Sequence, residues 1–265
     1  SLKLTSLIQK ISNTDATVLI NGSTGTGKEV VSNLIHHFSN RADKAFVAVN
    51  CAAIPDQMLE SMLFGHEKGA FTGAVQPNEG LLRAANEGTV LLDEISEMPL
   101  ALQAKLLRVI QEKKVMPIGS SKEVSVDVRI VATTNRDMAE EVREGKFRED
   151  LYYRLNVFPI NTLRLIDRNS DIPAIVANIL YSMDKDKEEK VKISAQVFEK
   201  LMEYNWPGNV RELYNVVQRA TILCEKNTIC VSDLIFDDFD KSKSTNTAEA
   251  LAAKFRTTKS SEMVL

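Results

Sequence analysis

Eight consecutive residues near the start of the chain have the types and the spacing that bind a phosphate group. Glycine allows the backbone turns that point successive N–H groups at one anion, and a helix beginning here would add its positive N-terminal end. A lysine near the end of the stretch supplies a point charge for the outer phosphates. The pattern of Gly, four residues, Gly and Lys therefore predicts a nucleotide-binding loop, with a flexible glycine turn as the simpler alternative. The residues are Gly22, Ser23, Thr24, Gly25, Thr26, Gly27, Lys28 and Glu29.

Glu29 stands where this pattern has a Ser or Thr that binds magnesium. Its carboxylate could reach the metal through a water molecule, or other ligands could hold the ion. Both arrangements are open at this point, and we expect a nucleotide with Mg²⁺ in either case.

Two adjacent carboxylates, Asp93 and Glu94, follow an apolar run at residues 89–92. A strand that ends in two acids downstream of a phosphate loop is typical of nucleotide-hydrolysing enzymes. The first acid would bind the metal ion and the second would polarise the attacking water. The alternative is a pair of solvated acids at a strand end, and the upstream phosphate loop favours the catalytic assignment.

Polar residues also end two other apolar runs. Asn50 follows residues 45–49, and Asn135 follows a run that begins at Val126. At the carboxyl end of a strand in an α/β sheet, such side chains point toward the usual ligand crevice. Asn135 is therefore placed to sense the terminal phosphate or to orient water, whereas Asn50 either faces the same crevice or caps the turn that follows it.

Three arginines could bind a phosphate charge. Arg148 and Arg154 lie six positions apart, and arginine can stabilise a developing phosphoryl charge when a neighbouring subunit supplies it. Surface ion pairs are the commoner role of such residues. Arg211 falls in the first turn of the helix after residues 206–209, where a cation is unfavourable unless an anion faces it. A nucleotide phosphate would supply that anion.

A glycine-rich segment at residues 64–74 reads as a loop, because glycine disfavours helix and strand interiors. Phe71 would lie at the tip of this loop. An exposed aromatic side chain on a mobile loop suits contact with a protein partner, whereas a turn folded back onto the core is the alternative.

The apolar periodicity predicts the elements that position these residues. Five apolar runs alternate with helical patterns, and right-handed crossovers then give a doubly wound parallel sheet flanked by helices. The expected strands span 17–21, 45–49, 89–92, 126–133 and 156–160, and the expected helices span 1–13, 28–38 and 100–111.

From residue 171 onward the strand patterns disappear. Helical patterns cover 171–183, 194–204 and 210–224, which indicates a small all-α lid. The charged run at 184–192 would be a solvated connection. We expect an α/β nucleotide-binding subdomain at 1–165, the helical lid at 166–238, and a polar tail or linker at 239–265 that is disordered.

The composition is that of an ordinary soluble protein, with 44% hydrophobic and 26% charged residues in a chain of 265. A net charge of −3 gives no broad attraction to DNA and argues against a simple DNA-binding module. Cys51, Cys224 and Cys230 have no metal-ligand spacing and indicate buried thiols in a reducing compartment. No apolar run reaches the roughly 20 residues that span a bilayer, so we expect a cytoplasmic protein without a membrane partner.

Five segments together closely resemble the central AAA+ domain of bacterial enhancer-binding proteins, the activators of sigma-54 RNA polymerase. The resemblance runs from about Thr14 to Leu234, and Gly-Ala-Phe-Thr-Gly-Ala at 69–74 is highly specific to that family. It implies an ATPase ring of six or seven subunits that pushes a loop against sigma-54 and opens promoter DNA. The five segments are Gly-Ser-Thr-Gly-Thr-Gly-Lys-Glu, Glu-Lys-Gly-Ala-Phe-Thr-Gly-Ala, Val-Leu-Leu-Asp-Glu, Phe-Arg-Glu-Asp-Leu-Tyr-Tyr-Arg-Leu and Trp-Pro-Gly-Asn-Val-Arg-Glu-Leu.

The resemblance also implies roles around the nucleotide. Lys28 would hold the phosphates of ATP, with Glu29 in the same loop. Asp93 would bind Mg²⁺ and Glu94 would activate water, while Asn50 resembles the switch that restrains that glutamate.

Further roles follow from the same resemblance. Asn135 is similar to the first sensor of the family, and Arg211 to the sensor in the lid. Arg148 and Arg154 resemble arginine fingers that act on the ATP of the next subunit. The expected contacts with the sigma factor are Gly69, Ala70, Phe71, Thr72, Gly73 and Ala74, with Phe71 and Thr72 touching it directly.

Two places depart from the family pattern. Residues 163–172 lack the prolines and one arginine of a Leu-Arg-Glu-Arg stretch, so the linker between sheet and lid could bend differently. Residues 75–79 lack the basic residue that usually precedes Gly80. No N-terminal regulatory domain or C-terminal DNA-binding domain is visible, so we expect an excised ATPase core whose DNA contact runs through a missing C-terminal domain.

Two other functions share most of these features. An AAA+ motor of another class, such as a helicase loader or a protein-unfolding ring, would have the same sheet and lid, and the element at 69–74 distinguishes it. A nucleotide-gated adaptor would bind without turnover, which the paired acids and the two candidate arginine fingers argue against.

Overall fold

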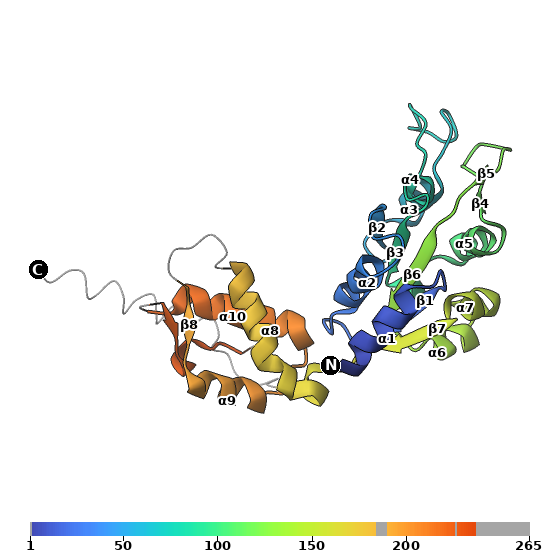
Figure 1. Ribbon diagram of the computed structural model, residues 1–265. Coiled ribbons are helices and arrows are strands. Elements are labelled where there is room, and N and C mark those ends of the chain that lie inside the picture. Colours follow the sequence, from blue (N-terminus) through green and yellow to red (C-terminus); the bar gives the residue numbers. More distant parts are fainter. Residues whose placement is uncertain (1, 184–189, 226, 237–265) are drawn as a thin grey trace, which may run out of the picture.

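Five parallel strands form the central sheet of the protein (Figure 1). The computed structural model describes residues 2–183, 190–225 and 227–236. The strand order is β2-β3-β6-β1-β7, so the doubly wound parallel sheet expected from the sequence is confirmed. The strands are β1 (Val18–Asn21), β2 (Phe46–Asn50), β3 (Thr89–Asp93), β6 (Arg129–Thr134) and β7 (Phe158–Asn161).

Helices cover both faces of this sheet (Figure 1). Successive residues of a strand point to opposite faces, so Leu19 packs in one hydrophobic cluster while Val18 and Ile20 pack in another. Strands buried on both sides read as continuous apolar runs, which is why the pattern was visible in the sequence. One face carries α1 (Leu2–Ser12) and α2 (Lys28–His37), and the other carries α3 (Asp56–Phe64), α4 (Leu81–Ala84), α5 (Leu100–Glu112), α6 (Met138–Arg143) and α7 (Glu149–Leu155).

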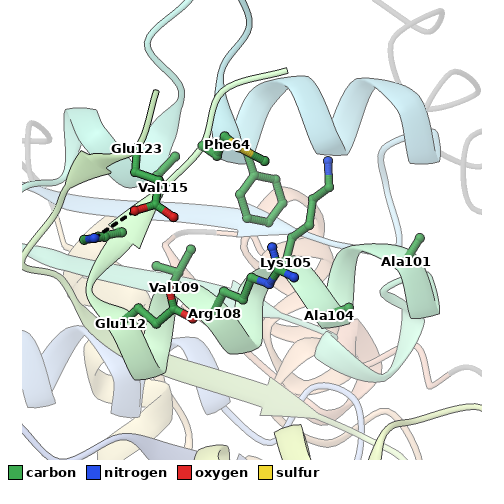
Figure 2. A pocket seen from close by; sticks show the side chains of 11 residues that line it. Phe64, Ala101, Ala104, Lys105, Arg108, Val109, Glu112, Val115 and Glu123 are labelled. Carbon is green, nitrogen blue, oxygen red and sulfur yellow. Dashed lines mark hydrogen bonds and ion pairs between the residues drawn. The ribbon is translucent and has the colours of Figure 1, made fainter. Parts of the chain in front are cut away.

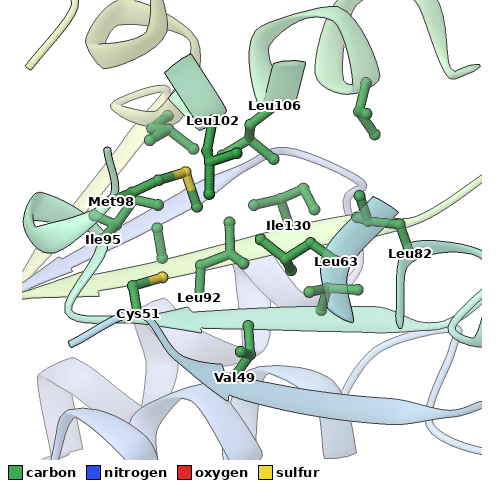
Figure 3. Packing of buried hydrophobic residues seen from close by; sticks show 14 of the residues in the cluster. Val49, Cys51, Leu63, Leu82, Leu92, Ile95, Met98, Leu102, Leu106 and Ile130 are labelled. Carbon is green, nitrogen blue, oxygen red and sulfur yellow. The ribbon is translucent and has the colours of Figure 1, made fainter. Parts of the chain in front are cut away.

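The larger of the two clusters joins the sheet to α5 (Figure 3). Leu92 and Ile130 of the sheet meet Leu102 and Leu106 of the helix in this cluster, and all four side chains are buried. Burial of each such side chain contributes about 1.5–3 kcal/mol. The sheet edge that holds the polar residues is therefore supported by a close-packed layer.

The carboxyl ends of the strands meet at one edge of the sheet. Asn50 is the register partner of Asp93 on the neighbouring strand, and Asn21 is the partner of Thr134. The polar residues that end the strands therefore lie side by side, although they are far apart in the sequence.

Strand β6 starts later than the apolar run that predicted it. Val126 N–H donates to the carbonyl of Lys113, and the carbonyl of Asp127 accepts from Glu87 N–H, so these residues are bonded outside the main sheet. They continue a small antiparallel hairpin of β4 (Lys114–Val115) and β5 (Val124–Ser125), where the sequence had indicated no element.

In its described residues the lid has three α-helices, α8 (Ile172–Met183), α9 (Ala195–Glu203) and α10 (Asn209–Leu223), after a short 3-10 helix at Leu165–Asp171. The helical character of the lid is as expected, with one difference. Residues 192–193 (β8) pair in parallel with residues 228–229 (β9), so strands do not disappear entirely. Two-residue strands were missed because period-2 alternation needs four or more residues to be seen.

Some expectations fall partly or wholly outside the described residues, namely most of the charged run 184–192 and the tail 239–265.

The thiol of Cys51 is buried and that of Cys224 partly so, but Cys230 is exposed, so the expectation of buried thiols was wrong for Cys230. Across the described ranges, no helix combines the length and apolarity needed to cross a membrane.

A buried histidine ties the helix that follows the phosphate loop to the strand that carries the carboxylates. His36 Nδ1 lies 3.0 Å from Thr89 Oγ1, which joins the end of α2 to the start of β3. Burial lowers the pKa of His36. A hydrogen bond with the backbone of Lys44 raises this pKa in part, and the charges of Arg129 and His37 lower it further.

The lowered pKa predicts a pH-dependent stability. Below the unfolded-state pKa of about 6.5, the unfolded chain binds a proton that the folded chain does not, so the free energy of unfolding falls by up to about 1.4 kcal/mol per pH unit. Urea unfolding between pH 7.5 and 5 measures this slope. His36→Asn should flatten it, and His37→Asn, at the exposed neighbour, is the control; an unchanged slope for His36→Asn would contradict the assignment.

Candidate nucleotide-binding site

The glycine-rich stretch forms the turn between β1 and α2, as its sequence predicted. Gly27 precedes the helix in a left-handed conformation with φ 94°, and Lys28 is the first helical residue. Gly22 has no room for a side chain, because a Cβ there would lie 1.9 Å from Thr162 Oγ1. The turn is thus held against the ends of β6 and β7, with Gly22 N–H donating to the carbonyl of Thr134 at 3.2 Å.

Lys28 lies beside the carboxylate that follows β3. Its Nζ is 3.5 Å from Glu94 Oε1 and donates to the carbonyl of Gly22 at 2.9 Å. The lysine is only 7% exposed and the Glu94 side chain 18%, so the pair is screened little by solvent. The phosphate loop and the candidate catalytic acid therefore share one site.

Glu94 is held in an unusual backbone conformation. Its φ of 52° is in the left-handed region, which non-glycine residues adopt mainly in turns and at functional sites. Glu94 N–H donates to Thr133 Oγ1, and Asn135 N–H donates to Glu94 Oε2 at 3.2 Å. Thr133 of β6 thus holds the backbone of Glu94, and Asn135, just after this strand, holds its carboxylate.

Asp93 is bonded on both of its oxygens. Thr133 Oγ1 donates to Oδ1, and Asn50 Nδ2 donates to Oδ2 at 2.9 Å. Asn50 Oδ1 also accepts from the N–H groups of Ala52 and Ala53. Asn50 therefore both faces the crevice and caps the turn, but its amide contacts Asp93 and not Glu94, the residue that the family resemblance had suggested.

Asn135 connects the carboxylates to the phosphate loop. In addition to its bond to Glu94, its Nδ2 donates to Thr24 Oγ1 at 3.2 Å. The sequence-predicted residues Thr24, Lys28, Asp93, Glu94 and Asn135 are thus gathered by side-chain contacts at one edge of the sheet.

Cys51 adds a buried thiol behind these acids. Burial, and then the charges of Asp93 and Glu94, raise the pKa of Cys51 to about 12. A thiol with so high a pKa stays protonated at neutral pH, so it does not act as a nucleophile.

The donor set fits a nucleoside triphosphate with Mg²⁺. Magnesium is usually bound by one or two carboxylates together with substrate phosphates and water, so Asp93 suffices as its protein ligand. No group of three or more His, Cys, Asp or Glu side chains suited to a metal occurs in the part of the chain described. Glu29 is exposed on the first turn of α2, and its contact with the ion through water stays a prediction.

The two candidate arginine fingers are not part of this cluster. Arg148 precedes α7 and forms an exposed ion pair with Asp150 at 2.7 Å, and Arg154 is exposed on the same helix. Burial of Leu151 and Leu155 fixes α7 on the face of the sheet opposite α2. Within one chain, neither arginine contacts the phosphate loop.

Arg211 lies close to the loop through the lid. It is in the first turn of α10, and a Cβ placed on Gly25 would be 3.1 Å from Arg211 Cβ. The base of the Arg211 side chain thus lies against the phosphate loop, and its contact with a phosphate stays a prediction.

Sequence reasoning gave no role to three residues that shape this site. Thr133 forms hydrogen bonds with the carboxylate of Asp93 and with the backbone N–H of Glu94. Thr162 packs on Gly22 and forms a hydrogen bond with Thr26 Oγ1 at 2.8 Å, and Asn209 donates to the loop backbone. Their sequence signal was a polar residue at or just after a strand end for the threonines, and an asparagine at the start of a helical pattern for Asn209.

The loop at 64–74 is closed on itself and half exposed. Gly69 N–H donates to the carbonyl of Ala74 at 2.9 Å, and His66 pairs with Asn78 at the base. Phe71 is 45% exposed, and its ring lies 5.0 Å from that of His66. Phe71 belongs to none of the hydrophobic core clusters of the described residues, so the alternative of a turn folded back onto the core was wrong. Mobility of the loop and contact with a partner stay predictions.

The β4–β5 hairpin supports this loop. Glu67 N–H donates to the carbonyl of Ile118, and Ile118 N–H donates to the carbonyl of Gly65, each at 2.9 Å. Gly119 approaches Ala70 so closely that a Cβ would come within 2.8 Å of the alanine methyl. The two loops project from the same end of the molecule (Figure 1).

A cavity of about 280 Å³ lies below these loops, between α5 and the hairpin (Figure 2). Its lining includes the apolar side chains of Phe64 and Val115 and the charged side chains of Lys105, Arg108 and Glu112. None of the residues predicted to bind nucleotide lines this cavity, so it is separate from the candidate site.

Two family models together match most of the chain. One is described as the Sigma-54 interaction domain and matches residues 1–161. The other is described as the AAA+ ATPase lid domain and matches residues 166–251.

Curated relatives are similar over most of the chain. This chain is 51% identical over 235 residues to the response regulator protein FleR of Pseudomonas aeruginosa. The matched region covers 88% of this chain and 50% of FleR. This chain is also 47% identical over 247 residues to the Nif-specific regulatory protein of Klebsiella pneumoniae. That match covers 93% of this chain and 46% of the relative. The chain thus spans about half the length of the curated relatives it matches.

Solved structures have the same fold. NtrX from Brucella abortus, crystallised in complex with ADP and with ATP, gives a TM-score of 0.82 at 32% identity, over 95% of this chain and 57% of that chain. Hsp104, with a TM-score of 0.60 at 17% identity over 78% of this chain and 40% of that chain, shares the fold alone.

Proposed function

Because this chain belongs to the family defined by the Sigma-54 interaction domain, we propose that it hydrolyses ATP to remodel sigma-54 RNA polymerase holoenzyme and open promoter DNA. Its relatives include a response regulator and a Nif-specific regulatory protein, and its own residues 166–251 match the AAA+ ATPase lid domain. The observation that carries the proposal is the pairing of Lys28 with Glu94 at 3.5 Å, which puts a phosphate-binding cation and a candidate base in one site.

The residues of this site divide the chemistry of hydrolysis. The N–H groups of residues 22–27 and the ammonium of Lys28 would bind the phosphates of ATP. Mg²⁺, held by Asp93, would neutralise charge that develops on the phosphates. Entry of the nucleotide replaces Glu94 as the partner of Lys28, which frees that carboxylate to accept a proton from the attacking water.

Two residues would report the state of the nucleotide. Asn135 touches both Glu94 and Thr24, so loss of the terminal phosphate would change both contacts. Asn50 holds Asp93, so the switch that we propose acts first on the metal ligand and only through it on Glu94. Arg211 would bind the phosphates from the lid.

A ring of six or seven copies would complete the site. Arg148 and Arg154 are exposed beside and on α7, which packs on the face of the sheet opposite α2, and from there they could reach the ATP of the next copy. Arginine supplied in trans stabilises the phosphoryl charge in the transition state and accelerates hydrolysis by about 10³–10⁵ in well-studied cases.

The proposal predicts that ATP turnover per subunit rises with protein concentration. At low concentration the arginines of one copy have no neighbouring site, whereas assembly places them against bound ATP. A series of ATPase rates from about 0.1 to 50 μM, with sedimentation at each point, measures this.

Arg154→Ala should remove the rise and leave ATP binding intact, with the exposed Arg143→Ala on α6 as the control. A turnover that is independent of concentration, in wild type that sediments as both monomer and ring, would contradict the shared site.

The loop at 69–74 would contact the sigma factor. Phe71 presents an exposed aromatic ring there, and such rings supply much of the energy of protein interfaces. The neighbouring hairpin would transmit movement to the loop, because Glu67 and Gly65 form backbone hydrogen bonds with Ile118 of the hairpin.

A further inference from the structure

Three successive carbonyl groups of the phosphate loop accept hydrogen bonds from the lid and its linker. Asn209 Nδ2 donates to the carbonyl of Thr24 at 3.0 Å, and Val210 N–H to that of Gly25 at 2.9 Å. Arg168 Nη2 donates to the carbonyl of Thr26 at 2.7 Å. The family matches do not assign a role to these contacts.

The three bonds act on the backbone groups that shape an anion site. A phosphate loop binds its anion through N–H groups that converge, so the carbonyls of the same peptide planes point away from the anion. A donor on each carbonyl satisfies it and fixes the plane. The lid therefore holds the carbonyl side of the loop by hydrogen bonds, while the N–H side stays free to bind the anion.

Asn209 is built into this contact. It is 2% exposed, and its φ of 54° is one that asparagine tolerates better than most residues. Its Oδ1 accepts from the linker residue Leu165 N–H at 2.8 Å, so one side chain joins the linker, the lid and the loop. The fit is close, since a Cβ on Gly25 would lie 2.3 Å from the carbonyl oxygen of Gly208.

Arg168 reaches the loop from the linker. Its backbone, with φ −142° and ψ 42°, interrupts the 3-10 helix Leu165–Asp171 and turns its side chain inward. Among the described residues its Nε is buried without a partner, which leaves the bond to Thr26 as the polar contact that holds it. This is the segment in which the sequence departs from the family pattern.

We propose that Asn209 and Arg168 are positioning residues that hold the phosphate loop in its anion-binding shape when the lid is docked. The inference rests on the proposed binding of nucleotide at this loop. It couples lid docking to nucleotide affinity, so a lid that moves away from Thr24, Gly25 and Thr26 would weaken nucleotide binding.

The test compares nucleotide affinity in two variants of the whole chain. Asn209→Gly removes both side-chain bonds without straining a left-handed backbone, and Arg168→Gln removes the bond to Thr26. Fluorescence titration with N-methylanthraniloyl-ADP should give a Kd about tenfold higher in each, which corresponds to about 1.4 kcal/mol. Since the lost binding is common to ground and transition state, KM for ATP should rise similarly and kcat at saturation should stay within about twofold.

Three controls separate the loss of these hydrogen bonds from a loss of charge and from a loss of folding. Arg164→Gln removes a cation from the same linker, where it pairs with Asp167, and should leave the Kd unchanged. Repeating the titrations at 0.1 and 0.5 M salt distinguishes a bonded effect, which persists, from a screened attraction. Thermal unfolding without nucleotide reports any loss of fold, and if Asn209→Gly does not fold, Arg168→Gln decides alone.

An unchanged Kd in folded variants overturns the inference, as does a loss that disappears at high salt or is matched by Arg164→Gln. If wild type itself binds no nucleotide, both this inference and the proposed function fail. If wild type binds and hydrolyses ATP while the variants bind equally well, the inference alone fails.

Discussion

Glu94→Gln is expected to lower ATP turnover by about 10²–10⁴, the range that general bases contribute, while nucleotide binding persists. The amide keeps the shape of the side chain but cannot accept a proton from water. It also removes the charge that holds Lys28 at 3.5 Å, so the ammonium is released for the phosphates and ATP affinity should be equal or higher. Single-turnover hydrolysis and a separate titration with a nucleotide analogue measure the two effects.

Glu97→Gln is the matched control for this experiment. Glu97 lies three residues further along the chain in the 3-10 helix Ile95–Glu97 and pairs with Arg136 away from Lys28. Its replacement should leave turnover within about twofold, as expected for an exposed ion pair. Undiminished turnover in Glu94→Gln would show that another group activates water, and a loss of binding as large as the loss of turnover would point to a structural role instead.

Phe71→Ala is expected to abolish formation of open promoter complexes while ATP turnover stays within about twofold of wild type. Phe71 is 45% exposed and contacts His66, and neither residue touches the phosphate loop or the acids. An aromatic residue at the centre of an interface contributes about 2 kcal/mol or more, which is about 30-fold in affinity. Promoter opening assayed with sigma-54 holoenzyme, alongside ATPase rates, separates the two activities.

The control for this prediction is Met58→Ala. Met58 is 59% exposed on α3. Its substitution by alanine therefore removes an apolar surface group of comparable size outside the loop at 69–74. It should leave both activities unchanged. Normal promoter opening by Phe71→Ala would exclude the loop from partner contact, and a parallel fall in ATP turnover would mean that the loop also supports the nucleotide site.

Much of this molecule was determined by local sequence patterns. The strands β1, β3 and β6 are buried on both sides, so each appears as an apolar run without reference to the rest of the fold. The glycines before Lys28 and the acids after residues 89–92 have spacings that chemistry itself requires, and parallel strands place their carboxyl ends at one edge. Fold class and candidate site therefore followed from the sequence.

Other features depended on contacts between residues far apart in the chain. Asn50 meets Asp93 and not Glu94 because the register of β2 against β3 pairs those two positions. The hairpin at 114–125 was not visible because its strands are two residues long and are supported by the glycine-rich loop.

The brace behind the phosphate loop was decided by the tertiary structure alone. Arg168 and Asn209 lie more than 140 residues from the carbonyls that they bind, and only the docked lid brings them together. A sequence pattern records which groups can form hydrogen bonds, but the pairing of a donor with a distant acceptor is set by how the two subdomains pack. The sequence thus determined which phosphate-binding and acidic groups the protein has, and the tertiary structure decided which other groups hold them in position.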